Sequence, residues 1–260
     1  MKLHPFFALL ALLVLAACQP DAPSSGAADR EPDQYDGDDI LLRDHDVPHV
    51  VVAEAFVTVA TPEDNIDSPA SWLQDGRLML VATAKQSDRL VVYDGRTGER
   101  LREVGAPGDG PGQLRRPNGV ATVDDRYAFV VERDNHRVQM FALPGFEPLL
   151  GFGADELVQP YGLWVRRAGE GYEVLVSDAY MAGEDAAGED IVPPLEQLDR
   201  RFRRFIVVPA GDGWRARATG AFGDTSAAGA IRVPESLFGD PDNDRLLVAE
   251  EDVPTGTRLR

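Results

Sequence analysis

Prolines recur in this 260-residue chain just ahead of short, apolar, β-rich runs, and their spacing constrains the fold more than any other feature. Four such entries contain Pro69, Pro117, Pro160 and Pro234, which are 48, 43 and 74 residues apart by subtraction. Gly and Pro punctuation with periods in the forties is typical of radially repeated sheets and not of helical solenoids. The pattern predicts an all-β chain folded as a β-propeller of four-stranded antiparallel blades.

Two further β-rich runs follow each of the first three entries. The middle runs are 78–83, 127–132 and 172–177, and the third runs are 90–93, 138–141 and 201–207. Alternation in such runs places one set of side chains against the neighbouring blade. The long third interval contains residues 181–198, an acidic stretch that we expect to project from a blade edge as a loop. Residues 50–59 are expected to form a first strand, a candidate for the strand that closes the ring.

About four blades of this period fit the strand-rich part of the chain, fewer than most closed propellers of this spacing need. Residues 257–260 begin what reads as another outer strand. An open propeller leaves unpaired strand edges and half-covered blade faces. We therefore expect a partial propeller, six-bladed when complete, and a sequence that is part of a longer chain.

The amino end has the pattern of a secretory signal. Lys2 supplies positive charge, an apolar run covers 6–16, and small residues precede the single cysteine, Cys18. Leu15-Ala16-Ala17-Cys18 resembles the lipobox of bacterial lipoproteins, in which this cysteine becomes the acylated first residue. The alternative is an ordinary secretory signal followed by an unrelated cysteine. Gln19 is similar to the residue found in outer-membrane-sorted members of that class.

These features divide the chain into a signal peptide (1–17), a disordered tether (18–49) and a propeller domain (50–260). The tether is rich in Asp, Pro, Ser, Gly and Ala, so it cannot bury enough apolar surface to order itself. Acyl chains on Cys18 would hold the protein at the cell envelope, on the outer membrane, facing the periplasm or the exterior. Its acylation leaves no cysteine for a disulfide or a thiolate site.

The formal net charge of −18 limits the partners that the chain can bind. Such a field repels nucleic acid, so we expect no nucleic-acid function. The arginines in 200–204 alternate with phenylalanine and are interpreted as a solvated face of an outer strand. Direct binding of an anionic substrate is also disfavoured, unless divalent cations bridge it to carboxylates.

Two family resemblances are carried by particular segments. Residues 110–120 with 135–141 resemble an NHL repeat, a propeller module often used as a binding platform. Other segments resemble the β-propeller phytases, calcium-dependent phosphomonoesterases that act on inositol phosphates. Asp-Ser-Pro-Ala-Ser-Trp at 67–72 is similar to their Asp-Asp-Pro-Ala-x-Trp entry, and Leu-Val-Ala-Glu-Glu-Asp at 247–252 is the closest match. The second resemblance covers most of 63–260.

A carboxylate cluster is predicted at the end of the last blade. On a strand, Glu250 and Asp252 point to one face and Glu251 to the other, while Glu235 lies at the entry of the same blade. Calcium takes about six to eight hard oxygen ligands, which such a cluster could supply in part. The alternative is that these are solvated turn residues. The phytase resemblance implies calcium as cofactor and adds Asp67 to Glu235, Glu250 and Asp252 as metal ligands.

Lys85 and Arg133 are the candidate catalytic cations. Lys85 is the one lysine left after signal removal, and it follows a strand at the place where the phytases have a phosphate-contacting lysine. A compact ammonium suits contact with one phosphate oxygen, although retention on a surface loop by chance is the alternative. Arg133 matches a phosphate-binding arginine of the family; the alternative is a turn residue paired with Asp134 or Glu132. Tyr161 matches a family tyrosine and is interpreted as blade packing.

Several departures from the phytase pattern weaken the expected chemistry. Ser68 replaces the second Asp of the first entry, Ala121 replaces a metal-coordinating Asp, and residues 177–180 lack the lysine of that blade. Each change removes a calcium ligand or a positive charge that would stabilise phosphoryl transfer. The resemblance is therefore compatible with weakened, altered or absent phosphatase activity.

Other catalytic classes find no support in the sequence. His45, His49 and His136 are scattered and lack metal-site spacing. There is no Gly-x-Ser-x-Gly elbow and no phosphate loop ending in Gly-Lys-Ser/Thr. The expectation is a monomeric, calcium-dependent, phytase-like hydrolase of inositol phosphates or related esters. The alternative is a non-catalytic NHL-like platform for an envelope protein or glycan.

Overall fold

The computed structural model describes residues 52–188, 190–250 and 258–259, and in this part of the chain nearly all regular structure is antiparallel sheet. Three sheets have four strands and the last has three, each in simple chain order. The first blade contains β1 (Ile66–Gln74), β2 (Arg77–Ala84), β3 (Arg89–Asp94) and β4 (Arg100–Val104). The second contains β5 (Pro117–Val123), β6 (Tyr127–Glu132), β7 (Arg137–Ala142) and β8 (Glu147–Phe152). The third contains β9 (Pro160–Ala168), β10 (Gly171–Asp178), β11 (Phe202–Ala210) and β12 (Gly213–Phe222), and the last β13 (Pro234–Asp240), β14 (Arg245–Glu250) and β15 (Arg258–Leu259).

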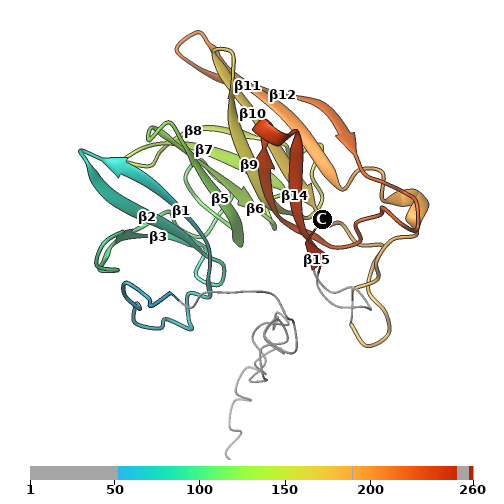
Figure 1. The fold of residues 1–260 in the computed structure, drawn as a ribbon, viewed down its shortest axis with the longest axis horizontal. Helices are drawn as coiled ribbons and strands as arrows, with labels where there is room; N and C mark the ends of the chain where they lie inside the picture. The colour runs from blue at the N-terminus through green and yellow to red at the C-terminus, as the bar shows by residue number, and fades with distance from the viewer. Residues whose placement is uncertain (1–51, 189, 251–257, 260) are drawn as a thin grey trace, which may run out of the picture. The chain divides into compact units, whose positions relative to one another are not determined.

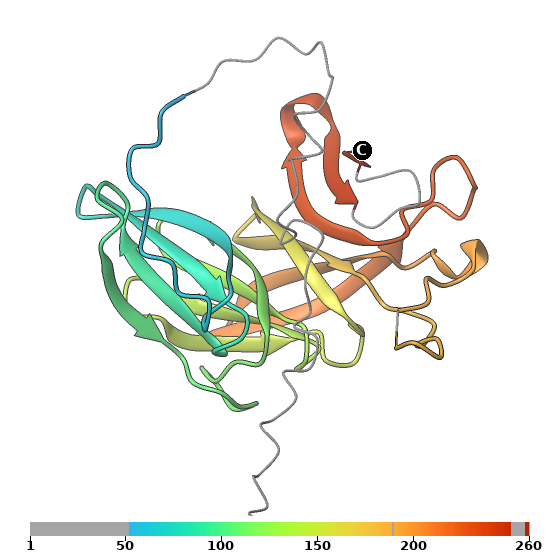
Figure 2. The same cartoon turned by 90° about the horizontal axis from the view of Figure 1, so that it is seen from below.

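This arrangement confirms the predicted fold class, a partial β-propeller of antiparallel blades. Figures 1 and 2 show the sheets following one another in chain order, from the cyan first blade to the red last one. The first strand of each blade contacts the first strand of the next: β1 with β5, β5 with β9, and β9 with β13. We call β1, β5, β9 and β13 the inner strands. None of the described helices is long and apolar enough to cross a membrane.

Every entry proline lies in an inner strand, whereas the sequence pattern placed it just ahead of the strand. Pro117, Pro160 and Pro234 are the first residues of β5, β9 and β13, and Pro69 lies within β1. Proline suits the start of a strand because its missing N–H removes no hydrogen bond from the middle of a ladder. The predicted insertion, 181–198, lies between β10 and β11. Its described residues include an isolated bridge between Glu184 and Asp190 and the short 3₁₀ helix η3 (Leu195–Gln197).

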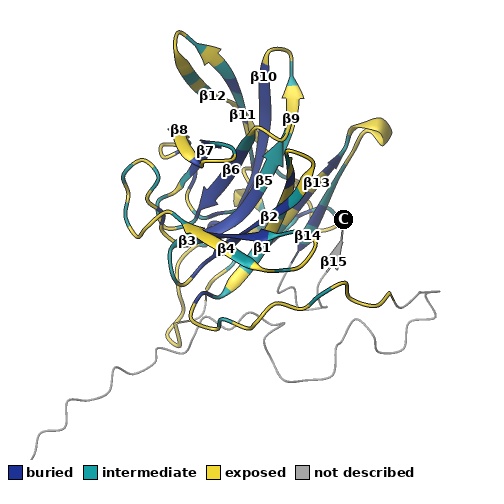
Figure 3. Ribbon diagram, turned by 90° about the vertical axis from the view of Figure 1, so that its left-hand side faces the viewer, coloured by how far each residue is buried: buried dark blue, intermediate teal, exposed yellow. Residues whose placement is uncertain are grey.

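The core lies between the blades. Trp72 and Phe141 belong to the cluster between the first and second blades, and Phe129, Tyr172 and Phe205 to the cluster between the second and third. Middle strands are the most buried, and in Figure 3 they appear largely dark blue, whereas the fourth strands carry most of the exposed positions. Burial of these alternating faces supplies most of the favourable energy of the fold.

A bulge interrupts every inner strand at the same place. In the first blade Ile66 pairs with Ala84 and Pro69 with Ala82, so Asp67 and Ser68 both lie opposite Thr83. The same irregularity follows Pro117, Pro160 and Pro234 in the other three blades. Such bulges turn a side chain out of the regular alternation and are common beside functional sites.

Hydroxyl groups opposite two of these bulges join neighbouring blades. Thr83 Oγ1 accepts a hydrogen bond from the Ser68 N–H at 3.1 Å and donates to the Asn118 carbonyl of the next blade at 2.7 Å. Ser177 Oγ likewise accepts from the Gly162 N–H at 2.7 Å and donates to the Glu235 carbonyl at 2.6 Å. These bonds fix the distance between adjacent inner strands.

Two sequence interpretations are wrong in the described part of the chain. Residues 52–60 form no strand, and Val52, Val57 and Val59 are more than 80% exposed, because no described sheet edge pairs with them. Within the 200–204 cluster, Arg201 is fully buried and not part of a solvated face. Its guanidinium donates to the carbonyls of Asp178, Tyr180 and Arg232, and burial lowers its pKa to about 10.

The close approach of inner strands predicts a specific sensitivity at Gly162. A Cβ at this position would lie 2.3 Å from the Glu235 carbonyl oxygen, a backbone atom that cannot move alone. We expect Gly162→Ala to lower the free energy of unfolding by about 1–3 kcal/mol, measured by chemical denaturation. Gly151→Ala is the matched control, since a Cβ there meets nothing within 4 Å. Equal stability of the two variants would contradict the close-approach explanation.

Candidate functional site

The bulges bring one residue of each blade to an equivalent position. In each blade, one inner-strand residue pairs with the last residue of the middle strand, and the equivalent position is the next residue along the inner strand. The residues at this position are Asp67, Asn118, Tyr161 and Glu235. Because consecutive inner strands are in contact, these four residues follow one another around one end of the hub. We call them the hub ring. Two of its members, Asp67 and Glu235, were predicted from the sequence as metal ligands.

Lys85 lies at the hub ring and connects two of its members. It follows the last residue of β2, and its ammonium is 3.5 Å from Asp67 Oδ2 and 3.5 Å from the Tyr161 hydroxyl oxygen. The ammonium also lies 5.7 Å from the centre of the Tyr161 ring, in cation–π range. Only 3% of the Lys85 side chain is exposed, compared with 30% of that of Asp67. Lysine and aspartate from the first blade therefore meet a tyrosine of the third.

Asn118 is the hub-ring residue between Asp67 and Tyr161 in blade order. It is fully buried, and neither its side-chain oxygen nor its side-chain nitrogen has a hydrogen-bond partner among the described residues. Buried amides normally find partners, because leaving one unpaired costs about 1–3 kcal/mol. An amide in this state can offer one acceptor and one donor to a bound molecule.

Carboxylates at the ends of three middle strands bind the backbone of the entry loops. Glu132, Asp178 and Glu250 end β6, β10 and β14, and all three are fully buried. Each accepts a hydrogen bond from the N–H two residues before the entry proline: Arg115 at 3.2 Å, Val158 at 3.2 Å and Arg232 at 2.8 Å. We call them the entry carboxylates. Glu250, predicted as a metal ligand, thus holds the loop that enters its own blade.

The electrostatics of Asp178 follow from this burial. Burial raises the pKa of Asp178, although the Gln159 N–H at 2.7 Å, the Val158 N–H and the positive charge of Arg203 favour its charged form. Arg203 Nε lies 3.7 Å from the carboxylate. Desolvation therefore outweighs these favourable interactions and the positive charge of Arg201 at this position.

Arg133 occupies the position in the second blade that Lys85 occupies in the first, one residue beyond the middle strand. Its Nε donates to Asp134 Oδ1 at 2.8 Å, which is the turn pairing that the sequence left as the alternative. It lines a shallow depression with Asp134, His136 and Gln159.

The described residues supply only part of a calcium site. Within residues 52–188 and 190–250, no three His, Cys, Asp or Glu side chains lie close enough together to hold a metal ion. Asp67 and Glu235 occupy equivalent places in the hub ring, and the Asn118 oxygen adds a neutral donor. Asp252, the fourth predicted ligand, and Cys18, the predicted lipidation site, both lie outside the described residues. Two carboxylates fall short of the oxygen set that calcium takes.

Comparisons with known proteins find distant resemblances among solved structures. No family model and no curated protein matches the chain. Among solved structures, it resembles a chain of a nidogen/laminin complex at 16% identity and TM-score 0.45, covering 73% of this chain and 58% of that one. It also resembles a GH43 β-1,3-galactosidase with galactodeoxynojirimycin, at 11% identity and TM-score 0.46; the match covers 80% of this chain and 76% of that one. A third similar structure is Kuenenia stuttgartiensis hydrazine synthase, at 13% identity and TM-score 0.40; the match covers 75% of this chain and 58% of that one.

Sequence reasoning missed Asn118 as a site residue and interpreted Tyr161 as blade packing. A usable signal was present, since Asn118, Tyr161 and Glu235 each follow directly an entry proline that starts its strand. Aligning the entries by their prolines would have placed the three together. Asp67 does not follow this rule, because Pro69 lies three residues later in its strand than Pro117 does.

The raised pKa of Asp178 predicts a pH dependence. The folded state holds this proton up to a higher pH than the unfolded state, whose pKa is near 3.8. Stability from this group is therefore greatest in acid and falls as pH rises from about 4 through the folded pKa. Relative to Asp178→Asn, the wild type should lose free energy of unfolding across that interval, as followed by denaturant titrations at several pH values. A wild type that gains stability relative to the variant would contradict the assignment.

Proposed function

We propose that this propeller binds phosphate monoesters at the hub ring and hydrolyses them with calcium, in the manner of the phytase-like phosphomonoesterases that its sequence resembles. The observation that supports the proposal is the meeting of Lys85, Asp67 and Tyr161 at one end of the hub, with Asn118 buried beside them. This arrangement places an ammonium, a phenol hydroxyl and an amide, all possible donors to an anion, at one end of the hub of an acidic chain.

The residues of the hub ring suit particular roles in this reaction. Lys85 would donate to a phosphate oxygen, and the Asn118 amide and the Tyr161 hydroxyl would orient the ester through hydrogen bonds. Asp67 and Glu235 would contribute to holding calcium together with donors such as Asp252. Bound calcium would offset the negative charge of ester and protein and lower the pKa of a bound water. In the net reaction, water adds to phosphorus, the ester P–O bond breaks, and the alcohol leaves with a proton.

The competition between Lys85 and calcium for Asp67 makes the two ligands interdependent. Without a cation, the Asp67 carboxylate lies 3.5 Å from the Lys85 ammonium and offsets its charge. A calcium ion that takes the Asp67 oxygens would release this ammonium for the phosphate. Binding of ester and calcium should therefore be cooperative.

A non-catalytic binding platform is the second candidate, and it has a specific observation in its favour. The Lys85 side chain is only 3% exposed and already contacts Asp67, as expected of a structural ion pair. In that case the hub ring would stabilise the inner strands, and an envelope protein or glycan would bind elsewhere on the blades.

The two candidates differ in phosphate release. We expect the purified protein to release phosphate from inositol hexakisphosphate with calcium and to stop when a chelator is added. Lys85→Ala should reduce the rate about a hundredfold, because it removes one preorganised charged donor. Arg96→Ala, on the turn between β3 and β4, is the control and should keep the full rate. No release and no calcium-dependent change in melting temperature would favour the platform.

A further inference from the structure

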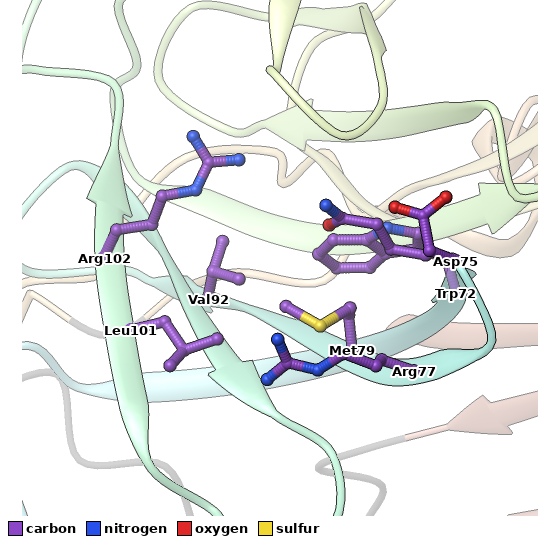
Figure 4. Close-up of a pocket in the computed structure, with 8 residues that line it drawn as sticks. Trp72, Asp75, Arg77, Met79, Val92, Leu101 and Arg102 are labelled. Carbon is purple, nitrogen blue, oxygen red and sulfur yellow. The ribbon is translucent and has the colours of Figure 1, made fainter.

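A cavity lies at the end of the first blade opposite the hub ring. Its volume is about 290 Å³, just below the range of about 300–1,000 Å³ typical of ligand sites. It lies beside the β1–β2 turn, on the face of the first blade that packs against the second (Figure 4). Its lining residues are Trp72, Gln74, Asp75, Arg77, Met79, Val92, Leu101 and Arg102.

The inner wall of this cavity is apolar and contains one unsatisfied donor. Trp72, Met79 and Val92 are buried, and Leu101, from the outermost strand, is 40% exposed beside them. The Trp72 indole N–H is buried and has no acceptor among the described residues. Its ring is fixed by an edge-to-face contact with Phe146 at 5.7 Å between centroids. A molecule in the cavity would meet an apolar surface and one N–H that lacks an acceptor.

The rim of the cavity carries both signs of charge. Arg77 is paired with Asp94 at 2.9 Å, so its charge is already offset. Arg102 donates to the Pro144 carbonyl and lies 5.4 Å from the Phe146 ring, but no described carboxylate pairs with it. Asp75 is exposed and has no ion pair among the described residues. One cation and one anion at the rim thus lack an oppositely charged partner.

The position of Asp75 is set by the backbone. Asp75 and Gly76 have φ values of 50° and 76°, the left-handed pair that a two-residue type I′ hairpin turn requires. The adjacent Leu73 N–H donates to Asp125 of the second blade at 2.8 Å, which ties this end of β1 to its neighbour. The rim is therefore held in place before any ligand arrives.

We propose that this cavity binds a free α-amino acid with an apolar side chain. The carboxylate would accept from Arg102 and from the Trp72 N–H, and the ammonium would pair with Asp75. The side chain would lie against Met79 and Leu101. A zwitterion pairs with both charges of the rim at once, whereas a simple organic acid would bring a second negative charge near Asp75 with no ammonium to offset it. The size of the cavity suits a molecule of this class.

Isothermal titration calorimetry with L-leucine and L-phenylalanine tests the proposal. Saturable binding is expected, and phenylalaninamide and N-acetylphenylalanine should each bind at least about tenfold more weakly, because each lacks one of the two charges. Asp75→Asn should reduce the affinity by a similar factor. Trp72→Phe, which keeps the ring and removes the N–H, should reduce it about fivefold.

Controls separate this site from the hub ring and from general loss of fold. Asp155→Asn, an exposed aspartate before β9, and Lys85→Ala should both bind the amino acid as the wild type does, with the folded state checked by near-UV circular dichroism. Absence of binding by either amino acid would overturn the proposal. So would equal affinity for the amide and acetyl derivatives, since the charges at the rim would then play no part.

Discussion

The bulge beside each entry proline is the constraint on which the rest of the molecule depends. Two inner-strand residues face one residue of the middle strand in every blade, which lets one side chain of each pair leave the sheet alternation. In the middle two blades the next inner strand passes so close to the second residue of the pair that a Cβ would lie within 3 Å of its backbone. Gly119 and Gly162 fill this position in the middle two blades and Ser68 and Ser236 in the outer ones. The hub ring is a direct consequence of this backbone geometry.

The loop that enters the first blade is held by different contacts from those in the other blades. Its middle strand ends in Ala84, where the other three blades have a buried carboxylate. Its entry turn is tied instead by Asp64, which accepts from Ser87 at 2.7 Å and from Arg100 at 2.7 Å. Burial raises the pKa of Asp64, but these hydrogen bonds outweigh it, and the net pKa lies below the usual value. The entry of the first blade is therefore fixed without a carboxylate at the end of β2.

Much of the fold could be predicted from the sequence, because proline and glycine act locally. The entry prolines located the inner strands, and apolar alternation located the middle ones. The segment 52–60 shows the limit of that reasoning, since alternation there has no partner edge in the described part of the chain. Arg201 shows another, because its burial depends on three carbonyls that come together only in the folded chain.

The site was predicted less well, for a related physical reason. Strand alternation correctly placed Glu250 at a strand end, but the same position holds Glu132 and Asp178, whose oxygens are used by backbone N–H groups. A carboxylate near a strand end can serve a ligand or an entry loop, and sequence position alone does not separate the two. Asn118 was not predicted, because the sequence does not show that its side-chain amide is buried without a hydrogen-bond partner among the described residues.

The distribution of cations explains why a lysine stands at the hub. Arginines elsewhere in the blades join strands through paired carboxylates, as Arg137 does with Glu132 at 2.7 Å and Arg204 with Glu173 at 3.0 Å. A planar guanidinium needs room for several directed hydrogen bonds, whereas an ammonium is compact and can turn between partners. At a position where only 3% of the side chain is exposed, lysine can contact both Asp67 and Tyr161. The chain therefore uses arginine where the geometry is fixed and lysine where a buried charge must be shared between two blades.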